Sequence, residues 1–283
     1  MTSSSSDSSV VILSGETSKP LSFANYLAKT IKEIHKFRFA YKNFVINGIR
    51  VRYRRSKLGF LWTLLNPLLT MGVISLVFSY IFKQNIREYS IFLFSGLTPF
   101  NFLSAALMGS TTSIVNAESF YKKIYVPKIL FPLITVSIEA VNFILSISAL
   151  YILALLIGAK LTWTIILLPL VLLLMFAFVL GLGLILSITF VFFRDMFHFV
   201  QVGLTALFYL TPIMYPENSI PDQLRSIFTF NPFTYFVLLS RKVILGTPTS
   251  LMDWIIPTII AIIFLILGLL LLKKTEKGII FRL

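Results

Sequence analysis

Few residues in this chain have side chains that could do catalytic chemistry, and they do not cluster. His35 and His198 are the two histidines and form neither HxxxH nor HExxH, and there is no cysteine. The sequence therefore gives no indication of a zinc site, and it excludes thiolate ligands and a cysteine nucleophile. No Gly-Lys dipeptide occurs, so no Walker A loop is possible. We expect no catalytic residue, metal site or cofactor in this chain.

Positive charge is densest just before the first long apolar stretch. Arg52, Arg54, Arg55 and Lys57 lie within six residues there. Guanidinium groups pair well with phosphate oxygens, so these side chains could bind the anionic head of a lipid-linked substrate. They could equally serve only as a topology anchor held by anionic lipid.

A lone carboxylate, Glu139, lies inside a later apolar stretch. Such a group could line a pathway, join a proton relay or bond to a neighbouring helix. We favour the structural role, because one carboxylate makes a poor relay.

Long uncharged stretches predict the transmembrane helices that position those residues. Hydrophobic residues make up 57% of the chain and charged residues 13%, which excludes an ordinary soluble enzyme. Each uncharged stretch approaches or exceeds the roughly 20 residues that cross a bilayer. The fold class is therefore all-α integral membrane, with six transmembrane helices at 60–82, 90–115, 131–157, 163–192, 198–215 and 254–272.

The net charge of +14 reports orientation rather than nucleic-acid binding. Given six spans, 19 of the 25 Lys and Arg residues fall on the side of the two termini. Cytoplasmic loops collect Lys and Arg, so both termini are predicted to be cytoplasmic.

Three segments outside the spans have their own patterns. Residues 1–25 are Ser-rich and read as a disordered cytoplasmic tail ahead of a single domain, 26–283. Residues 37–57 predict an amphipathic helix in the headgroup layer. Between spans five and six, 216–246 predicts re-entrant outer helices that form either a gate or a structural cap, because prolines interrupt two short apolar pieces. The residues that punctuate this outer segment are Pro212, Pro216, Pro221, Asn231 and Pro232.

Two predicted cytoplasmic loops mix basic and aromatic residues. The first contains Tyr121, Lys122, Lys123, Tyr125 and Pro127, and the second contains Arg194 and Asp195. Each could be a solvated loop or a docking element for a soluble partner, and spacing alone leaves both interpretations open.

Five segments in order resemble the ABC-2 type permeases that export polysaccharides such as O-antigen, capsule and teichoic acid. They are Arg50–Pro67, Phe120–Pro132, Phe193–Asp195, Thr211–Pro221, and Asn231-Pro232 with the following Arg241 and Gly246. The resemblance covers roughly residues 37–250. It implies export of a lipid-linked polysaccharide, carried on polyprenyl pyrophosphate, across the inner membrane of a bacterium.

The same resemblance implies the partners. Such permeases are homodimers that pair with two copies of a separate ATP-binding subunit, which holds ATP and Mg. The resemblance also implies that residues 119–128 and 193–200 are ATPase-coupling elements, that 37–57 is an interface helix and that 215–246 forms outer gating helices.

Aromatic residues, 42 in all, are abundant enough to line a glycan path. Our candidates are Trp62, Phe100, Phe102, Phe208, Tyr209 and Tyr215, although any one of them could instead be lipid-facing filler.

Two other functions compete with polysaccharide export. One is an ABC-2 exporter of a drug or small lipid. The other is a membrane enzyme acting on a lipid-linked sugar, which would need clustered carboxylates or histidines that the sequence lacks.

Overall fold

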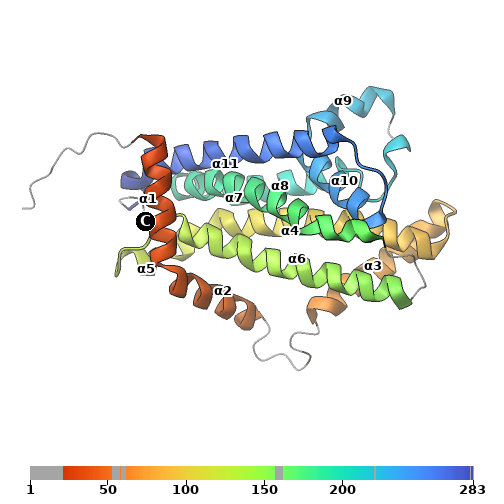
Figure 1. Cartoon of the computed structure of the whole chain (residues 1–283), viewed down its shortest axis with the longest axis horizontal. Helices are drawn as coiled ribbons and strands as arrows, with labels where there is room; N and C mark the ends of the chain where they lie inside the picture. Colours follow the sequence, from red (N-terminus) through yellow and green to blue (C-terminus); the bar gives the residue numbers. More distant parts are fainter. Residues whose placement is uncertain are drawn as a thin grey trace, which may run out of the picture.

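The computed structural model describes residues 22–52, 58, 62–156, 162–219, 221–280 and 282. Every regular element in these ranges is a helix, which confirms the all-α prediction (Figure 1). The elements are α1 Phe23–Lys36, α2 Arg38–Arg52, α3 Trp62–Ile81, α4 Ile86–Asn116, α5 Glu118–Tyr121, α6 Leu130–Leu156, η2 Trp163–Leu167, α7 Leu168–Phe192, α8 Met196–Tyr209, η3 Glu217–Ser219, α9 Asp222–Phe230, α10 Pro232–Leu245 and α11 Leu251–Ile280.

Four stretches within the described residues are long and apolar enough to cross a membrane. They are Ile86–Tyr121, Leu130–Ile152, Trp163–Phe192 and Leu251–Glu276. Shorter apolar stretches, Leu68–Ile81 and Met196–Tyr209, occupy the places of predicted spans one and five. The 14 residues of α8 rise only about 21 Å, less than the roughly 30 Å of a hydrocarbon core. The four long helices are established, and six spans remain a prediction.

Helices α7 and α11 form the closest helix pair of the bundle. A Cβ atom at Gly181 would collide with the backbone of Phe264, and one at Gly268 would collide with the backbone of Gly181. Only residues this small let two helix backbones approach so closely. Beside this crossing, the Phe178 ring stacks on Phe236 of α10 with centroids 4.7 Å apart. The crossing therefore also anchors α10 to the bundle.

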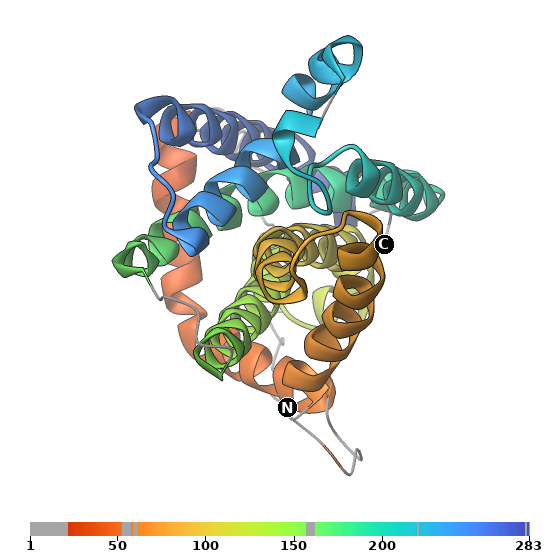
Figure 2. The ribbon, with the colours of Figure 1, turned by 90° about the vertical axis from the view of Figure 1, so that its right-hand side faces the viewer.

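The two ends of the bundle carry different elements. Helix α1 runs across the bundle axis at one end, near α5 and the end of α11, while α9 and α10 lie at the opposite end (Figure 1). Seen from that opposite end, α9 projects away from the bundle (Figure 2). The apolar side chains of Phe23, Leu27 and Ile34, spaced four and seven residues apart, pack α1 against the main core.

The N-terminal region differs from its expected boundaries. Helix α1 begins at Phe23, within the segment 1–25 that composition assigns to the tail, and a break at Phe37 separates it from α2. Most of that tail and the end of the expected 37–57 helix lie outside the described residues. Two helices meeting at Phe37 thus stand where one was expected, because an apolar face extends upstream of Lys36.

The apolar residues of α2 and of the turn before it pack against protein. Phe37, Tyr41, Phe44 and Val45 pack on a small core beside the start of α6. The Tyr41 hydroxyl lies 2.6 Å from Ser137 Oγ of α6. Further along α6, Asn142 Nδ2 donates to Glu139 Oε2 of the same helix at 2.9 Å.

Candidate functional site

A neutral groove of about 450 Å³ runs between α4 and α8. Its lining residues recur every three to four positions along both helices, which places them on one face of each. None of the described lining residues carries a charge. The groove is lined by Phe100, Asn101, Ser104, Ala105 and Met108 of α4 and by Gln201, Leu204, Thr205, Phe208 and Tyr209 of α8.

The groove combines polar and aromatic side chains. Asn101, Gln201 and Thr205 are exposed and offer amide and hydroxyl groups. Towards the end that carries α10, the Phe100 and Phe208 rings meet edge to face, with centroids 5.3 Å apart. Tyr209, 68% exposed, continues this aromatic end. The combination of neutral polar groups and flat aromatic faces suits an uncharged hydroxylated ligand, such as a sugar, better than an ion.

At the end of the bundle that carries α10, Asn231 joins the segment after α8 to the start of α10. Its Nδ2 donates to Leu210 O at 3.0 Å and to Thr211 Oγ1 at 2.9 Å. Its Oδ1 accepts from the Phe233 N–H at 3.0 Å, which caps α10, and Pro232 follows as the first helical residue. These contacts explain why an Asn-Pro pair begins this helix.

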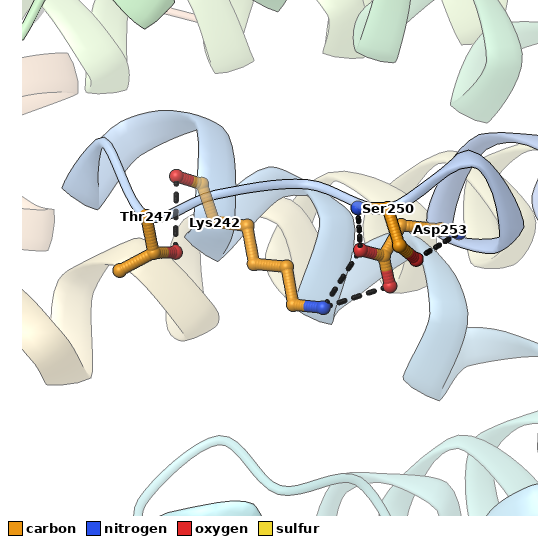
Figure 3. Close-up of polar contacts among 4 residues, drawn as sticks. All are labelled: Lys242, Thr247, Ser250 and Asp253. Carbon is orange, nitrogen blue, oxygen red and sulfur yellow. Dashed lines mark hydrogen bonds and ion pairs between the residues drawn. The ribbon is translucent and has the colours of Figure 1, made fainter.

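The other end of α10 is fixed to α11 by an ion pair (Figure 3). Lys242 Nζ lies 2.7 and 2.8 Å from the two carboxylate oxygens of Asp253. The same carboxylate accepts from the Ser250 N–H at 2.7 Å. The turn between them needs Gly246, because its φ is +71° and a Cβ there would collide with Thr162. Helix α10 is thus anchored at both ends.

Helix α9 is held far less firmly than α10. Its Phe228 is buried and lies 6.3 Å from the Tyr215 ring, but Phe230 is 87% exposed. Pro221 precedes its first turn, and its Arg225 pairs with Asp222 of the same helix. The outer segment therefore has a fixed part, α10, and a loosely attached part, α9.

At the opposite end, α1 contacts the loop before α6. We call residues 118–128, which contain the predicted ATPase-coupling element 119–128, the coupling segment. Its Tyr125 hydroxyl donates to Glu33 Oε1 of α1 at 3.0 Å. Burial, and then the bond to and charge of Glu33, raise the pKa of Tyr125 to about 12, so the phenol is protonated and donates at neutral pH. Two turns earlier on the same face of α1, buried Tyr26 lies within electrostatic reach of Glu276 near the end of α11.

The coupling segment itself is a short helix followed by a turn. Lys122 pairs with Glu118 one turn earlier, and the Tyr121 hydroxyl donates to Lys128 O at 3.3 Å. Lys123 is exposed, whereas Pro127 is buried. A surface-exposed basic turn on a fixed base is a suitable docking element for a soluble protein.

Comparison with known proteins identifies the family. The family model described as ABC-2 type transporter matches residues 41–245. This chain is a member of the ABC-2 type transporter family.

Several relatives of this ABC-2 chain have descriptive names. It is 34% identical over 197 residues to an O-antigen export system permease protein RfbA of Myxococcus xanthus, covering 70% of this chain and 76% of that protein. It is 29% identical over 230 residues to an RfbA of Klebsiella pneumoniae, covering 81% and 88%. It is 28% identical over 216 residues to the polysialic acid transport protein KpsM of Escherichia coli, covering 71% and 79%.

The structure of this ABC-2 chain brings only part of the predicted glycan path together. Phe100, Phe208 and Tyr209 line the groove. Phe102 is buried on another face of α4, against Phe143 with centroids 5.6 Å apart. Tyr215 lies near the aromatic end, where its hydroxyl donates to Tyr209 O at 2.7 Å. Trp62 is half-exposed at the start of α3, and nothing described joins it to the groove.

The other predicted residues fall in three places. Helix α2 ends at Arg52, while Arg54, Arg55 and Lys57 lie outside the described residues. Arg194 is exposed beside Phe190, 5.3 Å from its ring centroid, and Asp195 precedes α8. In the outer segment, Pro212 is buried and Pro216 half-buried.

Sequence reasoning missed the polar residues of the groove and the buried Arg241. Asn101 and Ser104, like Gln201 and Thr205, stand three to four residues apart in otherwise apolar helices. That spacing is a readable signal of a polar face. Charge counting places Arg241 on the outer side and does not predict its burial; only 6% of its surface is exposed.

Proposed function

We propose that this chain is the transmembrane permease subunit of an ATP-driven exporter that moves a lipid-linked polysaccharide across the bacterial cytoplasmic membrane. The observation that carries this proposal is that relatives aligned over 70–81% of the chain are named for O-antigen export or polysialic acid transport. The neutral, aromatic-ended groove supports it because sugars present hydroxyl groups and apolar ring faces. ATP hydrolysis then belongs to a separate subunit, which holds ATP and Mg.

The proposed topology has six spans with both termini in the cytoplasm. Helices α3 and α8 supply spans one and five, and the non-helical residues after α8 complete the short fifth span. The excess of Lys and Arg at the end that carries α1 and the coupling segment supports a cytoplasmic location for that end.

The proposed assembly is a homodimer with two ATP-binding subunits. The groove of one copy is open along its side, so a second copy facing it would close a path between the subunits. The glycan would then slide past Phe100, Phe208 and Tyr209, where aromatic faces stack on sugar rings without binding them deeply. The coupling segment and Arg194-Asp195 would dock on the ATP-binding subunits and transmit their closure to the helices.

Entry and exit use the two ends of this path. Arg52, Arg54, Arg55 and Lys57 would recruit the pyrophosphate head of the lipid carrier from the inner leaflet. The outer segment 216–246 would cover the exit. Because α10 is anchored at both ends, α9 is the part of this cover that opens.

Deleting the gene for this chain in its own bacterium tests the proposed function. Surface polysaccharide should disappear while polyprenyl-linked polysaccharide accumulates inside the cell, and the wild-type chain should restore export. Unchanged surface polysaccharide in the deletion strain would contradict the proposal.

The R54E/R55E variant tests the lipid-head site separately. It should reduce export while still assembling with the ATP-binding subunit. The K83E/R87E variant, with the same change of charge at the outer end, should export normally. Normal export by R54E/R55E would refute this site alone.

A further inference from the structure

Arg241 places a charged side chain in the interior of the outer end. It projects from α10 with only 6% of its surface exposed. A buried charge is costly unless it is fully hydrogen-bonded. Its Nη1 donates to Pro212 O and its Nη2 to Ile213 O, each at 2.6 Å, and its guanidinium carbon lies 4.0 Å from the centroid of the Phe92 ring. Among the described residues, the hydrogen bonds of this guanidinium go to backbone carbonyls, and its buried Nε has no hydrogen-bond partner.

Helix α4 is shaped to receive this guanidinium. A Cβ atom at Gly96 would collide with Arg241 Nη2 and lie 3.1 Å from its Cζ. Any other residue at position 96 would thus displace the guanidinium from the two carbonyls. Phe92 and Gly96 stand one helical turn apart on the same face of α4, so one turn of α4 supplies both the ring and the space.

Three successive carbonyl groups are held in this way. Arg241 binds those of Pro212 and Ile213, and the Tyr89 hydroxyl of α4 donates to Met214 O at 2.8 Å. The next residue, Tyr215, donates through its hydroxyl to Tyr209 O. Tyr209 lines the aromatic end of the groove. A continuous row of contacts therefore runs from α4 and α10 to the end of the groove.

We propose that Arg241 is a positioning residue that fixes Tyr209 and Tyr215 at the outer end of the groove, where their rings contact the exported sugar. Gly96 and Tyr89 act with it. This inference rests on the proposed function and adds a specific role: Arg241 sets how efficiently ATP hydrolysis is converted into glycan movement at the exit.

The test uses the full chain assembled with its ATP-binding subunit in proteoliposomes, with polyprenyl-pyrophosphate-linked polysaccharide as the transported probe. Export and ATP hydrolysis are measured together. The R241M variant should lower export about tenfold while ATP hydrolysis stays within twofold of wild type. R241K keeps the charge but loses the two-pronged donor, so its export should fall between those of wild type and R241M.

Two variants reach the same contacts without altering Arg241. G96A should reproduce the R241M pattern, and the milder Y89F should lower export about threefold. G203A is the matched control, because a Cβ at Gly203 would point into open space beside its own helix, and it should export normally. If R241M does not fold, Y89F and G96A still decide the question.

The outcomes separate this inference from the proposed function. Wild-type export per ATP in all of these variants, or an equal loss of export and ATP hydrolysis, would overturn the positioning role. Absence of ATP-dependent polysaccharide export by the wild-type assembly would instead refute the proposed function.

Discussion

Cysteine labelling of the groove distinguishes an aqueous glycan path from a lipid-facing surface. The natural chain contains no cysteine, so each single-cysteine variant reports one position. Thr205→Cys places a thiol on the groove wall, and Ala206→Cys places one at the same depth about 100° around the helix. Both positions are exposed in the single chain. Phe102→Cys, at a position with 3% exposure, is the buried control.

The expected magnitude follows from thiol ionisation. A thiol in water has a pKa of about 8.5, so about 5% of it is the reactive thiolate near pH 7.2, and each unit of increase in apolar surroundings cuts that fraction about tenfold. A charged maleimide in membranes containing the assembled exporter should therefore label Thr205→Cys at least about tenfold faster than Ala206→Cys or Phe102→Cys. If Thr205→Cys reacts as slowly as Ala206→Cys, the groove faces lipid and the assigned path is wrong.

Three further predictions concern the ends of the bundle. Tyr125→Phe removes a hydrogen bond to Glu33 worth about 1 kcal/mol. Amide hydrogen exchange in the coupling segment should therefore accelerate about fivefold without a large change in melting temperature. An unchanged rate of amide exchange would contradict the contact. Asp253→Asn breaks the partly exposed ion pair with Lys242 and should lower the free energy of unfolding in detergent by about 1 kcal/mol. The Lys242→Met/Asp253→Asn double variant should lower the free energy of unfolding by no more than this. Burial, and then the charge of Glu276, raise the pKa of Tyr26 to about 12. The stability gained from its neutral phenol is therefore present below pH 10 and lost as the pH rises towards 12. Tyr26→Phe should flatten this alkaline loss of stability, and an unaltered alkaline melting profile would refute the prediction.

The sequence predicted the long helices well because the bilayer imposes a length and a polarity on them. Uncharged stretches predict most boundaries of α4, α6, α7 and α11 to within one or two helical turns, and several of them to within a few residues. The short α8 was expected to continue to residue 215, because apolarity alone does not show where Thr211-Pro212 ends a helix. The sequence did not predict helix α1, because lysines interrupt its apolar residues and its apolar face packs on neighbouring helices rather than on lipid.

The candidate site was only partly predictable. Aromatic type alone does not separate Phe100, on the groove, from Phe102, on another face of the same helix two residues away. Which face lines a path depends on which neighbour each face meets, and that is a tertiary property. Arg241 shows the same limit, since charge counting gives only its side of the membrane and does not predict that its partners are carbonyls 28 and 29 residues away in sequence.

Reconstituted transport tests the central claim most directly. The purified chain and its ATP-binding subunit are placed in liposomes with polyprenyl-pyrophosphate-linked polysaccharide, and transfer across the bilayer is followed by access of an added glycosidase to the glycan. The account predicts transfer that requires ATP and both subunits. No transfer of the glycan, together with ATP-driven movement of a fluorescent phospholipid or drug by the same liposomes, would contradict it.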